Sequence, residues 1–490
     1  MRFSHTSVPK ILTPKTLLKV QNWARWTHLW LSIVFVIAFS VSFWQLRKNA
    51  ILNWDEGFYT DGMRQIFITK NLVVPYWNHQ PFLDKPPLHI IVGTVGVLIF
   101  GQNEFGYRFT SATALTFVLF LSTWWVYKKF GWLPSLITFS SLITNNILIW
   151  RGHYANTDAV LTFFVLLTFL VTVSKVRYRY PLLGILLGLT YLTKAGVAFF
   201  PAGAVGLYEV FEYFRTEKWE VKKRLVLVLC ALVLPGIWLL AGYLQEGWRF
   251  IQFYLFQSDY ETSSISLTQW SLFYPKVMIS SMHVYTLALA VSVLNACIEV
   301  KKSLPRTLLL FALPLPFFLS FSSVHYHWYL LPVMPLLSIL IGYTFWKVTQ
   351  YVPWPWVKIM TVIVVIFITI WAFYKRVIPI YAVDVAYPQQ QSGLKLKSLT
   401  APNEIIIRLD HLYPTMIHYS ERRVLASDKE QQVSKDYFLT RKDLQVAVQQ
   451  GTYHWVVGKN EDVAKFLQQV PDVPYEIIDV ADSEKIIHFL

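Results

Sequence analysis

Charged side chains of both signs gather in residues 53–108, between two strongly apolar segments of the chain. The charged residues of this stretch include Asp55, Glu56, Asp61, Asp84, Lys85, Glu104 and Arg108. A charge beside a membrane costs several kcal/mol unless it is paired, hydrated or bound to a charged ligand. Such a dense cluster therefore indicates a functional site rather than a linker.

Other polar residues stand at the ends of apolar segments later in the chain. We expect them on the same outer level as the first cluster: Arg151, His153, Asp158, Lys194, His283, His325 and His327. Lysine and arginine can hold a phosphate group while a carboxylate faces the reacting partner. Cations and carboxylates around a cavity at membrane level suit a lipid that carries a phosphate.

The composition places these residues in a membrane protein. Of the 490 residues, 54% are hydrophobic and 15% are charged, and the mean hydropathy is +0.41. Repeated apolar stretches of roughly 16–20 residues indicate a polytopic α-helical membrane protein. Both cysteines, Cys230 and Cys297, fall within apolar segments, so the sequence indicates no disulfide framework.

The net charge of +15 is unevenly distributed. Residues 375–490 are nearly neutral, so the excess lies in the short loops between apolar segments. That pattern is typical of loops kept on the cytoplasmic side of a membrane and gives no reason to expect nucleic acid as a partner.

The basic loops fix a predicted topology of about eleven spans. The N-terminal flank is basic (Arg2, Lys10, Lys15, Lys19 and Arg25), which predicts a cytoplasmic N-terminus and a first span that is retained as an anchor. The apolar segment 88–101 is short, and we expect it to lie in the membrane interface. The predicted spans are 29–46, 107–127, 132–150, 159–174, 181–193, 196–213, 225–243, 284–300, 307–322, 329–346 and 357–374.

The sequence predicts two domains. Residues 1–378 form the membrane domain, with 47–106 as its first outer loop, and residues 379–490 form a small extracytoplasmic α/β domain. Its predicted strands are 404–410, 422–426, 454–459, 475–480 and 485–490, with amphipathic helices over 439–450 and 461–470. We expect this domain to cover the outer mouth of the membrane site.

Six segments, taken in order, carry a family resemblance. They are WDEGFY (54–59), DKPPL (84–88), GQNEFGYR (101–108), RGHYANTDAVLTFF (151–164), GLTYLTKAGVAFFP (188–201) and WYLLPVMPLLSILIG (328–342). Together they resemble GT-C glycosyltransferases of the aminoarabinose transferase type, with protein O-mannosyltransferases as more distant cousins. Two positions depart from the family pattern: Phe58 replaces an arginine or other polar residue, and Asp84 stands where glutamate is common.

The resemblance implies an inverting transfer of a sugar from a polyprenyl-phosphate donor to a lipid or envelope acceptor, on the outer face of the cytoplasmic membrane. The implied catalytic residues are Asp55, Glu56, Lys85 and Asp158. The implied donor-phosphate ligands are Lys85, Arg151, Lys194 and Arg108. The implied sugar or acceptor contacts are Tyr59, Asp84, His325, His327 and Tyr329. No cofactor is implied with certainty; a divalent metal ion stays open, with Asp84 and His283 as its candidate ligands.

Several alternatives stay open at this stage. A hydroxyl acceptor needs a base, for which Asp55 is best placed, whereas a phosphate acceptor such as one on lipid A is already anionic. Asp55 and Asp158 could simply cap helices, Lys85 could be an interfacial anchor, and Lys194 a turn residue. A transporter or flippase of an anionic or lipid-linked substrate is the alternative function, although the sequence has no internal repeat.

Overall fold

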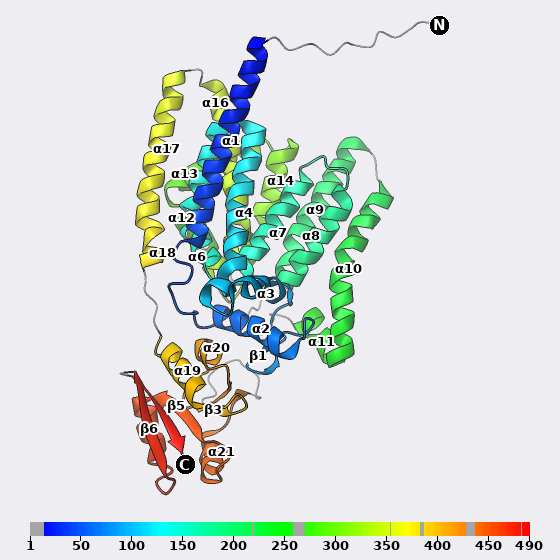
Figure 1. Cartoon of the computed structure of the whole chain (residues 1–490). Coiled ribbons are helices and arrows are strands. Elements are labelled where there is room, and N and C mark those ends of the chain that lie inside the picture. Colours follow the sequence, from blue (N-terminus) through cyan, green and yellow to red (C-terminus); the bar gives the residue numbers. More distant parts are fainter. Residues whose placement is uncertain are drawn as a thin grey trace.

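The computed structural model consists mostly of helices, with a small sheet near the C-terminus (Figure 1). The structure describes residues 14–217, 220–257, 270–352, 354–382, 387–427, 437–481 and 483–490, with side chains from residue 27 onward. The basic residues of the N-terminal flank, on which the predicted cytoplasmic N-terminus depends, lie outside the side chains described.

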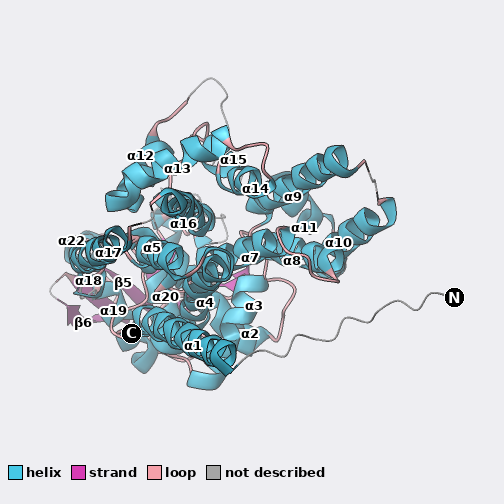
Figure 2. Ribbon diagram, turned by 90° about the horizontal axis from the view of Figure 1, so that it is seen from above, coloured by secondary structure: helices cyan, strands magenta, loops and turns pink. Residues whose placement is uncertain are grey.

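Helices packed side by side form one bundle (Figures 1 and 2). The longer ones are α1 (Pro14–Phe43), α4 (Glu104–Phe130), α7 (Thr157–Thr172), α8 (Arg179–Thr193), α9 (Ala195–Thr216), α10 (Val221–Glu246), α16 (Met334–Tyr351) and α17 (Pro355–Arg376). The shorter ones are α5 (Trp132–Ile143), α6 (Asn146–Gly152), α11 (Trp248–Gln252), η1 (Phe253–Gln257), α12 (Phe273–Met282), η2 (His283–Tyr285), α13 (Thr286–Ile298), α14 (Ser303–Ala312), α15 (Pro314–Leu319), η3 (His327–Val333) and α18 (Ile378–Ala382). Apolar side chains fill the space between these helices. Many outward-facing apolar side chains on α10 and α17 are exposed, as expected for surfaces that face lipid.

All eleven predicted spans fall on helices. By length and composition, five helical segments among the described residues can each cross a membrane, or six if one bent pair counts as a span. The bent pair is α5 and α6, which meet at 66° and together replace the predicted straight span 132–150. The bend places the end of α6, and with it Arg151, beside the start of α7.

The segment predicted to lie in the interface forms α3 (Leu88–Phe100), which crosses the lower end of the bundle (Figure 1). Beside it lies α2 (Asp55–Thr69), followed by a two-stranded hairpin of β1 (Tyr76–Trp77) and β2 (Gln80–Pro81). Apolar contacts between Met63 of α2 and Gly93 of α3 hold the two helices together. The first outer loop is therefore a structured layer under the bundle.

The five strands expected near the C-terminus all form, and they make one sheet. They are β3 (Ile405–Arg408), β4 (Arg423–Ala426), β5 (Trp455–Lys459), β6 (Tyr475–Ala481) and β7 (Glu484–Phe489), in the order β4-β3-β5-β7-β6. Strands β4, β3 and β5 are parallel, and β7 and β6 are antiparallel. The helices beside the sheet are α19 (Pro388–Leu399), α20 (Pro414–Ser420), α21 (Arg441–Gln449) and α22 (Asn460–Leu467). Helices α21 and α22 confirm the two expected amphipathic segments, whereas α19 and α20 were not predicted.

Candidate functional site

Four charged residues from four separate segments form one chain of ion pairs. Asp158, in the first turn of α7, lies between Arg151 Nη2 at 2.6 Å and Lys194 Nζ at 3.3 Å. The same guanidinium reaches Asp55 Oδ2 at 3.0 Å. Asp158, Arg151 and Lys194 are buried, but the Asp55 side chain is 42% exposed. Asp55 is thus the carboxylate of this chain that a substrate can approach.

Local structure fixes both ends of the pair between Arg151 and Asp158. The Asn156 side chain caps α7 by accepting hydrogen bonds from the amides of Asp158 and Ala159, at 3.0 and 3.4 Å. Its amide nitrogen also donates to the carbonyls of Arg151 and Tyr154. The turn between α6 and α7 is therefore closed by a side chain, so the pairing does not depend on solvent-exposed contacts. Asp158 lies in the first helical turn, but Asn156 is the residue that caps it.

The turn between α8 and α9 places Lys194. Lys194 is the residue between the two helices, with extended backbone angles, and its side chain is buried. An ordinary turn lysine would extend into solvent, whereas this one points at Asp158 and lies 4.1 Å from the centre of the Tyr329 ring. This geometry favours the prediction that Lys194 is a site residue over the prediction that it is an ordinary turn lysine.

Aromatic rings support the cations from the side of η3 and α6. The Arg151 guanidinium lies 4.5 Å from the Trp328 ring and 5.5 Å from the Trp150 ring. The His327 ring stacks on Trp150 at 5.5 Å. Cation–π contacts of this kind stabilise a positive charge without neutralising it. The two rings therefore stabilise the Arg151 guanidinium beside the carboxylates of Asp55 and Asp158.

Tyr59, Asp84 and Lys85 lie near the same cluster. Tyr59, on α2, is buried, and burial followed by the negative charge of Asp55 raises its pKa well above the usual range. The charges of Lys85, Asp84 and Asp158 also affect the pKa of this hydroxyl. Lys85 Nζ is 3.4 Å from Asp84 Oδ2, and the Lys85 carbonyl accepts a hydrogen bond from Tyr254.

Immediately before Asp55, the backbone is strained. Trp54 has a φ of 65°, a region that non-glycine residues rarely occupy. Such strain persists only where surrounding contacts impose it, and it gathers at functional sites. Two residues after Trp54, the Glu56 carboxylate accepts hydrogen bonds from the amides of Leu52 and Ala155, which hold this part of the chain in place.

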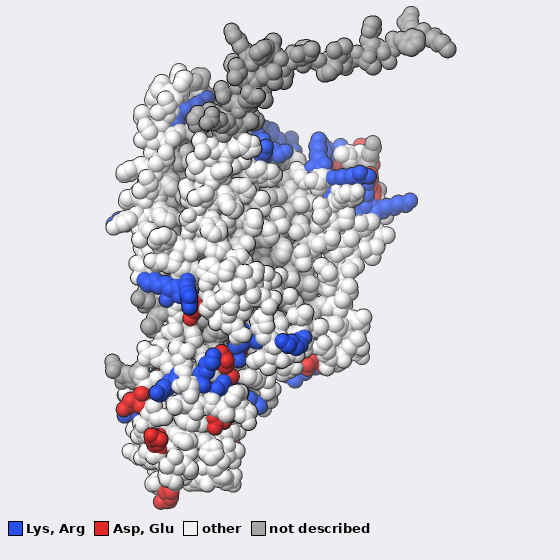
Figure 3. All heavy atoms as spheres, viewed as in Figure 1, with Lys and Arg blue, Asp and Glu red and all other residues white. Residues whose placement is uncertain are grey.

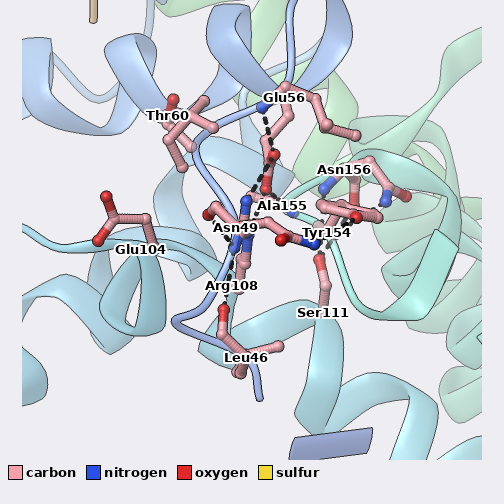
Figure 4. A network of polar contacts seen from close by, with 12 residues as sticks. Leu46, Asn49, Glu56, Thr60, Glu104, Arg108, Ser111, Tyr154, Ala155 and Asn156 are labelled. Atoms are coloured by element: carbon pink, nitrogen blue, oxygen red, sulfur yellow. Dashed lines mark hydrogen bonds and ion pairs between the residues drawn. The ribbon is translucent and has the colours of Figure 1, made fainter. Parts of the chain in front are cut away.

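Glu56 and Arg108 are paired with each other in the interior (Figure 4). Arg108 donates to both carboxylate oxygens of Glu56, at 2.7 and 3.0 Å, and to the carbonyls of Leu46, Asn49 and Ala50 at 2.8–2.9 Å. These five bonds use all five guanidinium N–H groups. Arg108 is only 1% exposed, so its expected role as a donor-phosphate ligand does not fit this geometry.

The Glu56 carboxylate is equally occupied. Besides Arg108, it accepts a hydrogen bond from the amide of Leu52 at 2.7 Å. It also accepts one from the amide of Ala155 at 2.9 Å (Figure 4). It is buried and faces no open surface. Through these bonds Glu56 ties the start of α2 to α4 and to the turn that precedes α7, while its expected catalytic role stays a prediction.

The histidines expected at the site differ in their surroundings. His327 lies beside Trp150, next to Arg151, whereas His325 packs against Phe273 and Tyr274, with ring centres 5.1 and 5.7 Å away. His283 stacks on Trp371 of α17. Asp84, the other candidate metal ligand, pairs with Lys85.

The donor set fits an anion better than a metal ion. Among the described residues, no group of three or more His, Cys, Asp or Glu side chains could hold a metal. The carboxylate of Asp158 faces two cations rather than other carboxylates. Divalent metals are usually held by several converging oxygen or nitrogen ligands. Asp84 and His283 therefore gain no support as metal ligands from this arrangement.

Sequence reasoning missed His89. It lies in the first turn of α3, is buried, and has no hydrogen-bond partner for either ring nitrogen among the described residues. Its ring packs edge-on against Tyr59 at 5.2 Å. The available signal was a single polar residue in an apolar segment directly after DKPPL. Trp150 and Trp328 were also missed, because tryptophan is common at membrane interfaces.

The C-terminal sheet is docked onto the first outer loop. Trp77 of the β1–β2 hairpin is fully buried in the same apolar cluster as Ile406 and Val424 of the sheet. Beside it, the Asn78 side chain donates to the Val424 carbonyl at 2.7 Å and accepts from the Val424 amide at 2.8 Å. The hairpin thus provides hydrogen-bond partners for the backbone amide and carbonyl of Val424 on the edge strand β4. These bonds attach the sheet to the first outer loop.

Helix α20 makes the second contact, and it lies against the start of α2. Thr415 donates from its amide to Asn53 and from its hydroxyl to the Ile51 carbonyl, at 3.2 and 3.0 Å. Tyr419 accepts from the Ile51 amide and donates to Glu104 at 2.8 Å. Three of these four contacts involve Ile51 or Asn53, which lie within four positions of Asp55.

Gly57 permits this contact, and replacing it should loosen the docking. A Cβ at Gly57 would lie 2.6 Å from Pro414 Cβ and 2.8 Å from the Pro414 carbonyl carbon. We expect Gly57→Ala to lower stability by about 1–3 kcal/mol through overpacking, measured as thermal unfolding in detergent micelles. Gly203→Ala on α9 is the control, because nothing lies within 4 Å of its added Cβ. Equal unfolding midpoints for the two variants would contradict a tight contact.

Comparison with known proteins finds similar sequences and similar structures. A family model described as dolichyl-phosphate-mannose-protein mannosyltransferase matches residues 84–239. An undecaprenyl phosphate-alpha-4-amino-4-deoxy-L-arabinose arabinosyl transferase of Proteus mirabilis (strain HI4320) is 24% identical over 331 residues, covering 64% of this chain and 59% of the relative. An uncharacterized protein of Aquifex aeolicus (strain VF5) is 28% identical over 230 residues, covering 46% of each chain. The chain thus spans about half the length of the curated relatives it matches.

Among solved structures, the crystal structure of ArnT from Cupriavidus metallidurans bound to undecaprenyl phosphate superposes with a TM-score of 0.73. The sequence identity is 17%, and the match covers 94% of this chain and 97% of that one. The helical bundle and the C-terminal sheet therefore define a polytopic membrane protein with the GT-C fold. Aminoarabinose transferases are thus among the proteins that this chain resembles in sequence and in fold.

Proposed function

We propose that this protein is an inverting glycosyltransferase that takes a sugar from a polyprenyl-phosphate donor and transfers it to a cell-envelope acceptor. The acceptor class is a lipid A-like glycolipid, another envelope glycan or a protein. The observation that carries the proposal is the ion-pair chain Asp55–Arg151–Asp158–Lys194, which leaves Asp55 half-exposed at its edge. The family model and the arabinosyl transferase relatives support the same reaction class.

In the proposed reaction, the bond between the anomeric carbon and the donor phosphate oxygen breaks as the acceptor oxygen attacks the opposite face. The electron pair of that bond leaves with the phosphate, so negative charge grows on it. Lys85 is the proposed cation for this charge, with Arg151 and Lys194 as additional ligands. Asp158 holds Arg151 and Lys194 in place, a role that fits its position between them.

Asp55 has one of two proposed roles, according to the acceptor. With a hydroxyl acceptor, its carboxylate takes the proton that the acceptor oxygen loses. With a phosphate acceptor, the attacking oxygen is already anionic, and Asp55 orients the acceptor without taking a proton. Tyr59, Asp84, His327 and Tyr329 are the proposed sugar or acceptor contacts, because they lie near the cluster.

We propose that the site faces the outside of the cytoplasmic membrane. Exposed lysines and arginines dominate the upper end of the bundle, whereas the lower end carries charges of both signs (Figure 3). The positive-inside rule then places the upper end in the cytoplasm, and residues 379–490 form an extracytoplasmic domain next to the membrane domain 1–378. The docking of α20 and the β1–β2 hairpin supports a role for that domain as a cover of the first loop.

Replacing Lys85 tests the proposed function. In liposomes that contain radiolabelled polyprenyl-phosphate sugars and an envelope lipid fraction, the wild type should label an acceptor. Lys85→Ala should lower the turnover by roughly 10²-fold, since removing one donor to a developing anion has effects of that order. Lys276→Ala is the control, because Lys276 is exposed on α12 and has no carboxylate partner among the described residues.

Two outcomes would contradict the proposal. If Lys85→Ala transfers sugar with the same kinetics as the wild type, Lys85 does not stabilise the leaving phosphate and is an interfacial anchor. No labelled acceptor with any donor, combined with movement of the labelled lipid across the bilayer, would favour the flippase alternative instead.

A further inference from the structure

A cavity lies at the end of the bundle opposite the candidate site. It is open, has a volume of about 460 Å³, and lies between the segment that leads into α8 and the first turns of α10. Its lining residues are Ser174, Lys175, Val176, Arg177, Tyr178, Arg179, Tyr180, Pro181, Glu220, Lys222, Lys223 and Val226. The proposed sugar transfer uses none of them.

The lining has far more positive than negative charge. Lys175, Arg177 and Lys222 are exposed and form no ion pair with a carboxylate among the described residues. Lys223 pairs with Glu220 at 2.6 Å, and Arg179 pairs with Glu209 outside the lining. Figure 3 shows lysines and arginines gathered at this end of the bundle. Positive charge without internal partners attracts an anion from outside the chain.

The other lining side chains are those of a membrane interface. Tyr178 is exposed beside Arg177, whose guanidinium lies 5.3 Å from the tyrosine ring. Val176 and Val226 are exposed apolar residues of the same lining. Below the cavity, exposed apolar side chains continue along α8 and α10, among them Leu182, Leu225 and Leu229. A ligand can therefore place a charged group in the cavity and an apolar chain along the helices.

Helices α8 and α10 hold this surface in a fixed shape. A Cβ at Gly184 would lie 2.3 Å from the Leu227 carbonyl, so the two backbones touch one turn below the cavity. Cys230 and Ala231 of α10 pack against the same glycine. The start of α8 and the first turns of α10, which line the cavity, are consequently held beside each other.

We propose that this cavity binds the phosphate headgroup of an anionic phospholipid, with the acyl chains lying along α8 and α10. Inorganic phosphate carries the same charged group as the lipid headgroup, but it has no acyl chain that could contact the apolar side chains along α8 and α10. A basic cavity between membrane helices, at the level of the headgroups, is a general solution for holding an acidic lipid. The proposal is independent of the sugar transfer, because the site is at the other end of the bundle.

The test is lipid retention measured by native mass spectrometry of the full-length protein. Detergent-purified protein is incubated with phosphatidylglycerol and phosphatidylethanolamine that carry the same acyl chains. The wild type should retain phosphatidylglycerol in excess. The triple variant Lys175→Gln/Arg177→Gln/Lys222→Gln should retain about tenfold less, since each cation near an anionic headgroup contributes measurably to binding.

The control removes the same number of charges elsewhere at the same end of the bundle. Lys128, Lys129 and Lys301 are exposed at helix ends outside the cavity, and their triple glutamine variant should retain lipid like the wild type. Thermal unfolding checks that each variant is folded, and the single variant Lys222→Glu repeats the test if the triple variant is not.

Three outcomes would overturn the proposal. Equal retention of both lipids by the wild type would remove the preference for an anion. Equal losses in the cavity and control variants would assign the effect to overall charge. Complete displacement of phosphatidylglycerol by inorganic phosphate, with loss of the same phosphate binding in the cavity variant, would identify a free-phosphate site instead of a lipid site.

Discussion

Asp55→Asn should lower sugar transfer to a hydroxyl acceptor by roughly 10²–10⁴-fold while the protein remains folded. Asparagine has the same shape as aspartate but takes no proton. Because Arg151 keeps its stronger pair with Asp158 at 2.6 Å, losing the charge at the half-exposed position 55 should leave the cluster assembled. The effect should therefore appear in turnover and not in folding.

The measurement is the initial rate of labelled sugar transfer in liposomes, with donor saturating. Asp472→Asn is the matched control, since Asp472 is exposed in the C-terminal part of the chain, outside the proposed site. A separate assay with a phosphorylated lipid acceptor distinguishes the two roles of Asp55. If Asp55→Asn lowers the transfer rate strongly with hydroxyl acceptors and only weakly with phosphate acceptors, Asp55 acts as a base. Full turnover of the variant with every acceptor would remove Asp55 from the mechanism.

Arg108→Ala should destabilise the protein by roughly 3–5 kcal/mol, because it leaves the buried carboxylate of Glu56 without its cation. Three backbone carbonyls, those of Leu46, Asn49 and Ala50, lose their donor in the same step. Arg108→Lys should restore only part of the stability, since an ammonium cannot reproduce five N–H groups in a fixed plane.

Thermal unfolding in detergent measures this loss, and Arg47→Ala is the matched control. Arg47 is exposed and lies next to Leu46 in the chain, so it tests an arginine without the buried network. The two roles considered for Arg108 predict different results. A variant with normal stability but weak donor binding would return Arg108 to the phosphate ligands, whereas an unstable variant supports the positioning role.

The departure at Phe58 has a structural explanation. Its ring stacks on Phe82 at 5.2 Å and packs edge-on against Trp77 at 4.6 Å, next to the apolar core of the C-terminal sheet. A charged residue there would have to be buried at a domain contact. The position that is polar in the family is thus part of the docking surface in this chain.

Local patterns in the sequence determined most of the fold. Apolar stretches of membrane length predicted the helices, and short β-branched runs predicted all five strands of the C-terminal sheet. The sequence also identified Asp55, Arg151, Asp158 and Lys194 as charged residues at the ends of helices. These features depend on residues close together in the chain, so periodicity and residue type reveal them.

The tertiary structure alone decided which charges are partners. Glu56 and Arg108 are 52 residues apart, and their residue types did not distinguish them from Asp55 and Arg151. In the structure the pair of Glu56 and Arg108 is buried, whereas Asp55 in the other pair is partly exposed. The same holds for His89 and for Trp77, whose surroundings come from distant segments. A charge stabilises structure or meets a substrate according to how fully its hydrogen bonds are met and how far water reaches it. Both properties depend on contacts between segments that no local pattern records.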